Sequence, residues 1–116
     1  MPSVLLVDDS AVVRRVLGRR LTAAGLAVHE ETTSAGARAV DTAGLACAII
    51  DIELPDGSGI DLAAAMLERN PSLRVAFFTS STATPVVERA RALGHVFAKP
   101  DLERLLAWVS GPPRGP

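Results

Sequence analysis

Two continuous apolar runs, and a third that is nearly continuous, constrain the fold of this chain more than any other feature of its sequence. They span residues 4–7, 46–50 and 73–78. Each has the length of a strand and needs apolar cover on both faces, as a central strand of a parallel sheet has. The stretches between them have helical periodicity. This alternation predicts an α/β fold, with a parallel sheet, helices on both of its faces and right-handed crossovers.

Weaker signals predict the remaining elements. A half-polar run at 27–32 suits a sheet edge, and 96–98 is a short last strand. Thr84 is expected to cap the fourth helix, with Pro85 at its first helical position, and Asp101 to cap the fifth. The five helices are expected at 11–24, 34–43, 59–69, 85–93 and 102–110. The apolar face of the first helix is expected to contain Val12, Val13, Val16, Leu17 and Leu21.

Length and composition exclude several classes of protein. The 116 residues leave room for one domain, and the net charge of −1 argues against direct binding of nucleic acid. No apolar run approaches the ~20 residues of a membrane span, and no secretion leader is recognisable, so we expect a cytoplasmic protein that does not enter the membrane. The single cysteine, Cys47, excludes an intramolecular disulfide framework and a multi-cysteine zinc site.

Polar residues follow the predicted strands at the points where the strands end. Asp8 and Asp9 follow the first strand, Asp51 the third, Thr79 the fourth and Lys99 the fifth. The carboxyl ends of parallel strands meet at one edge, where ligands bind in such folds, so we expect these side chains to converge. Clustered carboxylates repel one another unless a cation neutralises them, and oxygen ligands suit Mg²⁺ or Mn²⁺.

This set of residues predicts phosphoryl chemistry. An accessible aspartate beside a divalent cation can attack phosphorus, and a lysine and a hydroxyl can hold the other phosphoryl oxygens. Each residue alone has an ordinary explanation as a helix cap, a turn former or a solvated charge. Their joint occurrence at the ends of four strands favours a functional site.

The sequence resembles the receiver domains of bacterial two-component response regulators, here of a stand-alone type. The resemblance covers residues 3 to about 110 and rests on segments 5–10, 51–59 and 78–80 together with Lys99-Pro100. The spacing of Asp51, Pro55 and Gly59 is characteristic of the family. The resemblance implies a flavodoxin-like (βα)5 three-layer sandwich with strand order 2-1-3-4-5. It predicts a receiver domain at 1–110 and a disordered tail or linker stub at 111–116.

The resemblance also implies how a metal is bound. Asp9, Asp51 and the backbone carbonyl of Glu53 would bind Mg²⁺ directly, and Asp8 would act mainly through water. Asp51 would be the phosphoacceptor, supplied by a histidine kinase or a histidine phosphotransfer protein. The domain would then be a signalling phosphoacceptor that assists only its own phosphorylation and dephosphorylation, not an enzyme with turnover.

The remaining roles concern switching. Thr79 and Lys99 would contact the phosphoryl oxygens, and movement of the threonine would reshape the face formed by the fourth helix, fifth strand and fifth helix. Many members have an aromatic three residues before the lysine; here Val96 stands there and Phe97 follows. A shift of one residue changes the face of a strand, so we expect activation through the loop and the fourth helix instead. The candidate partner residues are Val87, Arg91, Val96, Phe97 and Trp108.

Other functions remain open at this stage. If the chain is complete, its output comes through a downstream protein or a homodimer formed on phosphorylation. One alternative is a phosphorylation-independent interaction module. A second is a small Mg²⁺-dependent phosphatase of the haloacid-dehalogenase-like kind, although Glu53 stands where that family has a second aspartate. A nucleotide-binding flavodoxin-like protein is a third, but a glycine-rich phosphate loop after the first strand is missing.

Overall fold

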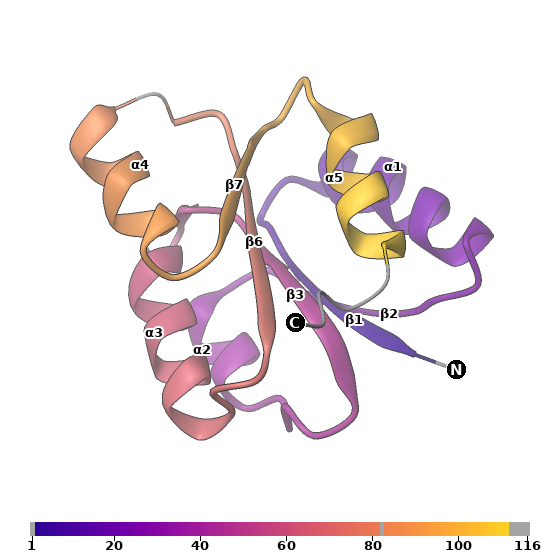
Figure 1. The fold of residues 1–116 in the computed structure, drawn as a ribbon, viewed down its shortest axis with the longest axis horizontal. Coiled ribbons are helices and arrows are strands. Elements are labelled where there is room, and N and C mark those ends of the chain that lie inside the picture. Colours follow the sequence, from indigo (N-terminus) through magenta and orange to yellow (C-terminus); the bar gives the residue numbers. More distant parts are fainter. Residues whose placement is uncertain (1, 82, 112–116) are drawn as a thin grey trace.

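The computed structural model describes residues 2–81 and 83–111, and it contains a five-stranded parallel sheet in the order β2-β1-β3-β6-β7 (Figure 1). This order confirms the predicted flavodoxin-like arrangement. The strands of this sheet are β1 (Ser3–Val7), β2 (Ala27–Glu31), β3 (Leu45–Ile50), β6 (Arg74–Thr79) and β7 (His95–Ala98). The helices are α1 (Ala11–Ala23), α2 (Ser34–Arg38), α3 (Gly59–Arg69), α4 (Thr84–Arg91) and α5 (Leu102–Ser110).

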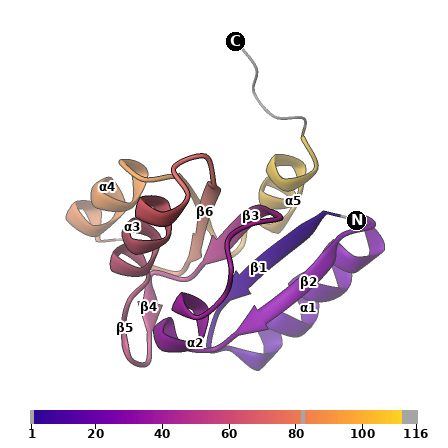
Figure 2. The same cartoon turned by 90° about the horizontal axis from the view of Figure 1, so that it is seen from below.

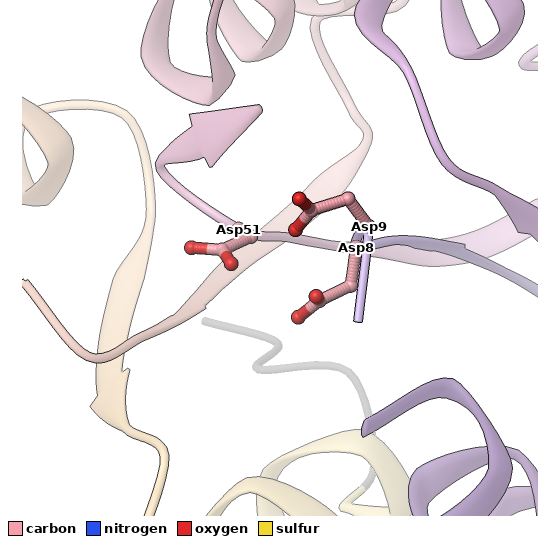
Figure 3. A group of neighbouring side chains, drawn as sticks. All are labelled: Asp8, Asp9 and Asp51. Carbon is pink, nitrogen blue, oxygen red and sulfur yellow. The ribbon is translucent and has the colours of Figure 1, made fainter. Parts of the chain in front are cut away.

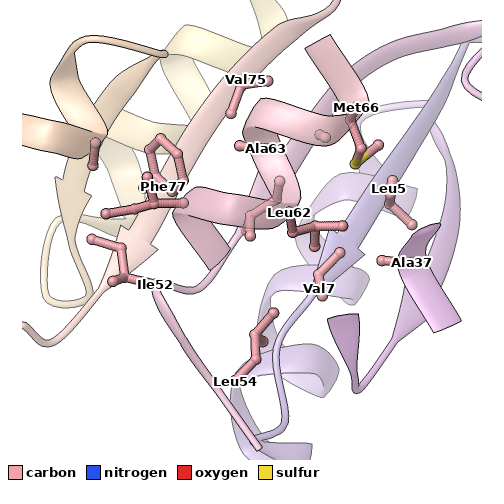
Figure 4. Close-up of a cluster of buried hydrophobic side chains, with 14 of the residues drawn as sticks. Leu5, Val7, Ala37, Ile52, Leu54, Leu62, Ala63, Met66, Val75 and Phe77 are labelled. Carbon is pink, nitrogen blue, oxygen red and sulfur yellow. The ribbon is translucent and has the colours of Figure 1, made fainter. Parts of the chain in front are cut away.

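The sheet separates two layers of helices, as Figures 1 and 2 show: α2, α3 and α4 cover one face, and α1 and α5 cover the other. Each face has its own apolar cluster. The first contains Leu5, Leu62 and Phe77 (Figure 4), and the second contains Leu6 and Leu105. The continuous apolar runs therefore form the central strands, because alternate residues of one strand enter opposite clusters.

Two local expectations are wrong, and a third is confirmed only in part. Helix α2 ends at Arg38 rather than near residue 43, because Arg69 donates hydrogen bonds to the carbonyls of Arg38 and Val40, which a longer helix would use itself. Ala83, not Thr84, is the cap of α4, so Thr84 lies inside the helix. Asp101 does occupy the cap position of α5, but its side chain forms no capping hydrogen bond.

The buried face of α1 is narrower than its apolar pattern predicts. Leu17 and Leu21 are buried, whereas Val12 is 67% exposed and Val16 is 46% exposed. Leu17 and Leu21 pack into the apolar cluster under α1 and α5, and Gly18, between them, faces Glu30 of β2. Periodicity alone does not tell which part of a wide apolar stripe a helix will bury.

The segment between Asp51 and α3 contains a small antiparallel hairpin. Its strands are β4 (Glu53–Leu54) and β5 (Gly57–Ser58), joined by Pro55 and Asp56. Gly57 has φ of 155°, a conformation that favours glycine. The hairpin lies beside α2 in Figure 2.

The last strand, expected at 96–98, begins one residue earlier, directly after Gly94. A Cβ at Gly94 would lie 2.3 Å from the carbonyl oxygen of Val75, so only glycine permits this close approach of α4's exit to β6. Val96 packs against the cluster under α3 and α4, and Phe97 against the cluster under α1 and α5. The expectation that these neighbours face opposite sides of the sheet is confirmed.

Candidate functional site

Three aspartates meet at the carboxyl edge of the sheet. Val7 of β1 and Ile50 of β3 are paired in register, so the residues that follow them, Asp8 and Asp51, come out side by side. Carboxylate oxygens of Asp8, Asp9 and Asp51 lie within 4.8 Å of one another, and Figure 3 shows the three side chains around a common space. Asp8 and Asp51 are buried and Asp9 is exposed, so the cluster opens to solvent on one side.

Lys99 supplies the positive charge next to this cluster. Its Nζ lies 2.9 Å from Oδ2 of Asp51 and 3.2 Å from Oδ2 of Asp8. Burial opposes the charge of the lysine, but the hydrogen bonds and negative charges of Asp51 and Asp8 prevail and raise the pKa of Lys99 above its ordinary value. Burial, reinforced by the charge of Asp51, raises the pKa of Asp8, against the hydrogen bond from Ser10 and the charge of Lys99.

Backbone contacts hold Asp8 in place. Its carboxylate accepts a hydrogen bond from the N–H of Ser10 at 2.9 Å, and its own N–H donates to the carbonyl of Glu31 at 3.1 Å. The guanidinium of Arg14, one turn into α1, donates to the Asp8 carbonyl at 2.9 Å. Ser10 in turn caps α1, because its hydroxyl accepts from the N–H of Val13. The site is thus built on the end of β1 and the start of α1.

The backbone around Asp51 is fixed by close packing. Its N–H continues the ladder to the carbonyl of Val7 at 2.9 Å, and its Oδ1 accepts from the N–H of Glu53 at 3.4 Å. A Cβ at Gly59 would lie only 1.9 Å from the Asp51 carbonyl oxygen. Glycine at the start of α3 therefore lets the helix approach the Asp51 backbone, which gives a physical reason for the spacing of these residues.

Thr79 ends β6 next to Lys99. Its side chain is 1% exposed, and its hydroxyl accepts a hydrogen bond from the N–H of Ser81 at 3.1 Å. The N–H of Lys99 donates to the Thr79 carbonyl at 3.1 Å, so the two residues leave the sheet side by side. The strand ends thus bring the predicted site residues to one edge of the sheet.

The donor set fits a divalent cation. Three carboxylates and one ammonium group leave the cluster with excess negative charge, and the three aspartates offer carboxylate oxygens as ligands. Magnesium prefers such oxygen ligands, with water completing an octahedron, and the exposure of Asp9 leaves access for water. The part of the Glu53 carbonyl in metal binding stays a prediction.

The predicted partner residues lie on both sides of β7. Val87 is half-buried on α4, and Arg91 is exposed at its end. Phe97 and Trp108 lie together, with ring centroids 6.2 Å apart. Trp108 is half-buried because it packs at the far, amino-terminal edge of the sheet, where its ring stacks under the Arg74 guanidinium at 4.2 Å. This packing supports a structural role for the tryptophan.

Sequence reasoning missed two contacts that shape this molecule. Arg74 donates to the carbonyl of Trp108 at 2.8 Å and so ties β6 to the end of α5. Asp56 accepts hydrogen bonds from the amino end of α2. Both join segments far apart in the chain, and neither has a periodic signal. A lone arginine at the start of an apolar strand was the only hint of the first.

The fold and the site together define a doubly wound α/β protein that carries a cation-binding carboxylate cluster at its strand ends. Residues 4–110 match the family model of the response regulator receiver domain, and the chain belongs to this family. Receiver domains are signalling modules of two-component systems. Their acidic pocket binds Mg²⁺, and the three aspartates form such a pocket here. Within the described residues, no helix has the length and apolar character needed to cross a membrane.

Similar proteins include the photosynthetic apparatus regulatory protein RegA of Rhodobacter capsulatus, which is 34% identical over 93 residues. That match covers 79% of this chain and 50% of RegA, so the chain spans about half the length of this relative. The non-phosphorylated HemR receiver domain of Leptospira biflexa superimposes over all of both chains, with a TM-score of 0.86 and 25% identity. A response regulator of Burkholderia pseudomallei with a phosphorylated aspartic acid has a TM-score of 0.78 and 25% identity, over 95% of this chain and 67% of its own.

Proposed function

We propose that this domain accepts a phosphoryl group on Asp51 from a phosphohistidine of a histidine kinase or a histidine phosphotransfer protein in the cytoplasm. The observation that carries the proposal is the cluster of three carboxylates within 4.8 Å, with Lys99 bonded to Asp51. Family membership and the phosphorylated aspartic acid of the Burkholderia regulator support it. The output is a change in the proteins that the domain binds.

The chemical step is an in-line displacement at phosphorus. A carboxylate oxygen of Asp51 forms the new O–P bond as the P–N bond of the phosphohistidine breaks, and the leaving imidazole nitrogen keeps the electron pair. Asp9, Asp51 and the Glu53 carbonyl would hold Mg²⁺, or Mn²⁺ in its place, with Asp8 acting through water. When bound, the cation supplies charge neutralisation at the phosphoryl oxygens.

Two further side chains would hold the transferred group. The Lys99 ammonium has three N–H donors, and two of them face Asp51 and Asp8 in the structure. A phosphoryl oxygen on Asp51 would compete for these donors. The Thr79 hydroxyl accepts from Ser81, which leaves its own proton free to donate.

Switching would then proceed through α4. Val96 stands at the position of the usual aromatic residue, and a valine has no large ring that could rotate inward. Its side chain packs against the cluster under α3 and α4. Movement of Thr79 would change the setting of α4 and with it the positions of Val87 and Arg91. A downstream protein, or a second copy of the phosphorylated domain, would bind the face that these residues share with Phe97 and Trp108.

Intact-mass analysis after incubation with acetyl phosphate tests the proposal. We expect one phosphoryl adduct on the wild type with Mg²⁺, none without the cation, and none on Asp51→Asn. Asp61→Asn is the matched control, because Asp61 is an exposed aspartate at the start of α3 and its loss should leave the adduct intact.

The alternatives give different results. Absence of an adduct on a folded, Mg²⁺-binding wild type, with phosphohistidine protein as well as acetyl phosphate as donor, would favour the phosphorylation-independent interaction module. Continuous release of phosphate from a phosphomonoester would favour the phosphatase. Size-exclusion chromatography of the phosphorylated protein then shows whether a homodimer forms.

A further inference from the structure

A side chain of the hairpin after Asp51 closes the amino end of α2. The Asp56 carboxylate accepts hydrogen bonds from the N–H groups of Ser34 at 2.7 Å and Ala35 at 2.9 Å. These N–H groups belong to the first turn of the helix and have no partner within it. The two bonds hold the pKa of Asp56 below its ordinary value, although the side chain is exposed. The hairpin and α2, about twenty residues apart in the chain, are thus joined by a charged cap.

Helix α2 depends on such bonds for its order. It has only five residues and contains Gly36, and isolated helices of this length do not persist in water. At its other end, Arg69 of α3 donates to the carbonyls of Arg38 and Val40. The hydrogen bonds that hold the two ends of α2, from Asp56 and Arg69, therefore both come from the segment that follows Asp51.

The hairpin is in turn bonded to the acidic site. The N–H of Glu53, at its start, donates to Oδ1 of Asp51, and Glu53 pairs with Ser58 across the hairpin. Leu54 is buried in the cluster under α3, and the N–H of Gly59 donates to the carbonyl of Ile52 at 2.7 Å. The hairpin therefore has little freedom to move independently of Asp51. A displacement of the Glu53 backbone would therefore also displace Asp56, which lies in the loop of the same hairpin.

We propose that Asp56 couples the acidic site to α2, so that cation binding at the site strengthens α2 and the cap of α2 strengthens cation binding. Coupling of this kind is reciprocal, and the same factor must appear in both measurements. Asp56 is then a positioning residue for the segment from Asp51 to Gly59. The surface of α2 and the hairpin becomes a second responsive region, separate from the face of α4, β7 and α5. The inference rests on the proposed function only in using the same acidic cluster as the cation site.

Magnesium titration of the full chain, combined with amide hydrogen exchange, tests the coupling. We expect Asp56→Ala to bind Mg²⁺ about fivefold more weakly than wild type, at the lower end of usual coupling factors. In the wild type, Mg²⁺ should slow exchange at the amides of 34–38 by a similar factor, and in Asp56→Ala it should not. Asp56→Asn keeps an acceptor oxygen and should restore part of both effects.

Asp41→Ala is the matched control. Asp41 is also an exposed loop aspartate that accepts a backbone N–H, that of Ala43 at 2.9 Å, and its removal changes the net charge by the same amount. It should bind Mg²⁺ as the wild type does. Asp56→Ala with wild-type Mg²⁺ affinity but loosened α2 amides would overturn the proposal.

The outcome can be separated from that of the proposed function. A wild type that binds Mg²⁺ but takes no phosphoryl group refutes the phosphoacceptor role, while the coupling is still decided by affinity and exchange. Should Asp56→Ala fail to fold, Asp56→Asn decides: unchanged Mg²⁺ affinity together with faster exchange at 34–38 overturns the coupling.

Discussion

Replacing Gly59 by alanine should destabilise the domain and displace the Asp51 carbonyl. The added Cβ would lie 1.9 Å from that oxygen and 2.9 Å from Cγ2 of Ile50, whereas real Cβ contacts below 3.0 Å are essentially never seen. The obstructing atom belongs to the backbone, so rotating a side chain cannot relieve the contact. The backbone segments at Gly59 and Asp51 must separate by about 1 Å.

The cost follows from the contacts that this separation disturbs. Overpacking in a tight site costs about 1–3 kcal/mol, and weakening the 2.7 Å hydrogen bond from Gly59 to Ile52 adds about 1 kcal/mol. The lower chain entropy of alanine returns about 0.5–1 kcal/mol. We therefore expect a loss of about 1–3.5 kcal/mol, a substantial part of the ~5–15 kcal/mol of a typical domain.

Urea unfolding followed by fluorescence measures this loss, because Trp108 is the only tryptophan and the chain has no tyrosine. Gly18→Ala is the control. Gly18 lies inside α1, and its Cβ would meet only the movable carboxylate of Glu30 at 3.3 Å, so this variant should be unchanged or up to about 1 kcal/mol more stable. Equal unfolding free energies for Gly59→Ala and Gly18→Ala would refute the steric argument.

Two further predictions concern charge and packing. Burial raises the pKa of Asp8 above its ordinary value of 3.8, so the folded state binds this proton more tightly than the unfolded state. The protonated side chain therefore stabilises the fold at low pH, and this stability is lost as the pH rises through the raised pKa and is absent at pH 7. Asp8→Asn should therefore raise the urea midpoint at pH 7 but not at pH 3, and an equal gain at both pH values would contradict this. Arg74→Met should lower stability by about 1 kcal/mol and shift the emission of Trp108, because it removes the stacked guanidinium and its hydrogen bond; unchanged emission would contradict the contact.

The central strands and the acidic cluster were predictable from the sequence for a clear physical reason. A run such as 46–50 has only one way to bury both of its faces, and the residue after each parallel strand must emerge at the same edge. Val7 and Ile50 are paired in register, so the meeting of Asp8 and Asp51 follows from the sheet itself.

What escaped prediction depends on contacts between distant segments. Helix α2 ends early beside Arg69, and Asp56 caps its other end. The partners of both residues lie more than twenty positions away and leave no periodic pattern. Val12 and Val16 are exposed while Leu17 and Leu21 are buried, and an apolar stripe does not specify which part of it will face the core. Ala83 and Thr84 differ by one position, and a shift of one residue at a helix end leaves no signal in the apolar pattern.

The sharing of Lys99 between Asp51 and Asp8 has a consequence for how a signal could leave the site. Phosphorylation converts the Asp51 carboxylate, with a charge of −1, into an aspartyl phosphate with a charge near −2, and a magnesium ion brings +2, so their joint arrival alters the summed charge of the pocket by only about +1. A single unit of charge changes the electric field at a distant surface little, because salt screens it over about 10 Å. The phosphorylated state should differ from the resting one by rearranged short-range contacts, and recognition of it should depend only weakly on ionic strength.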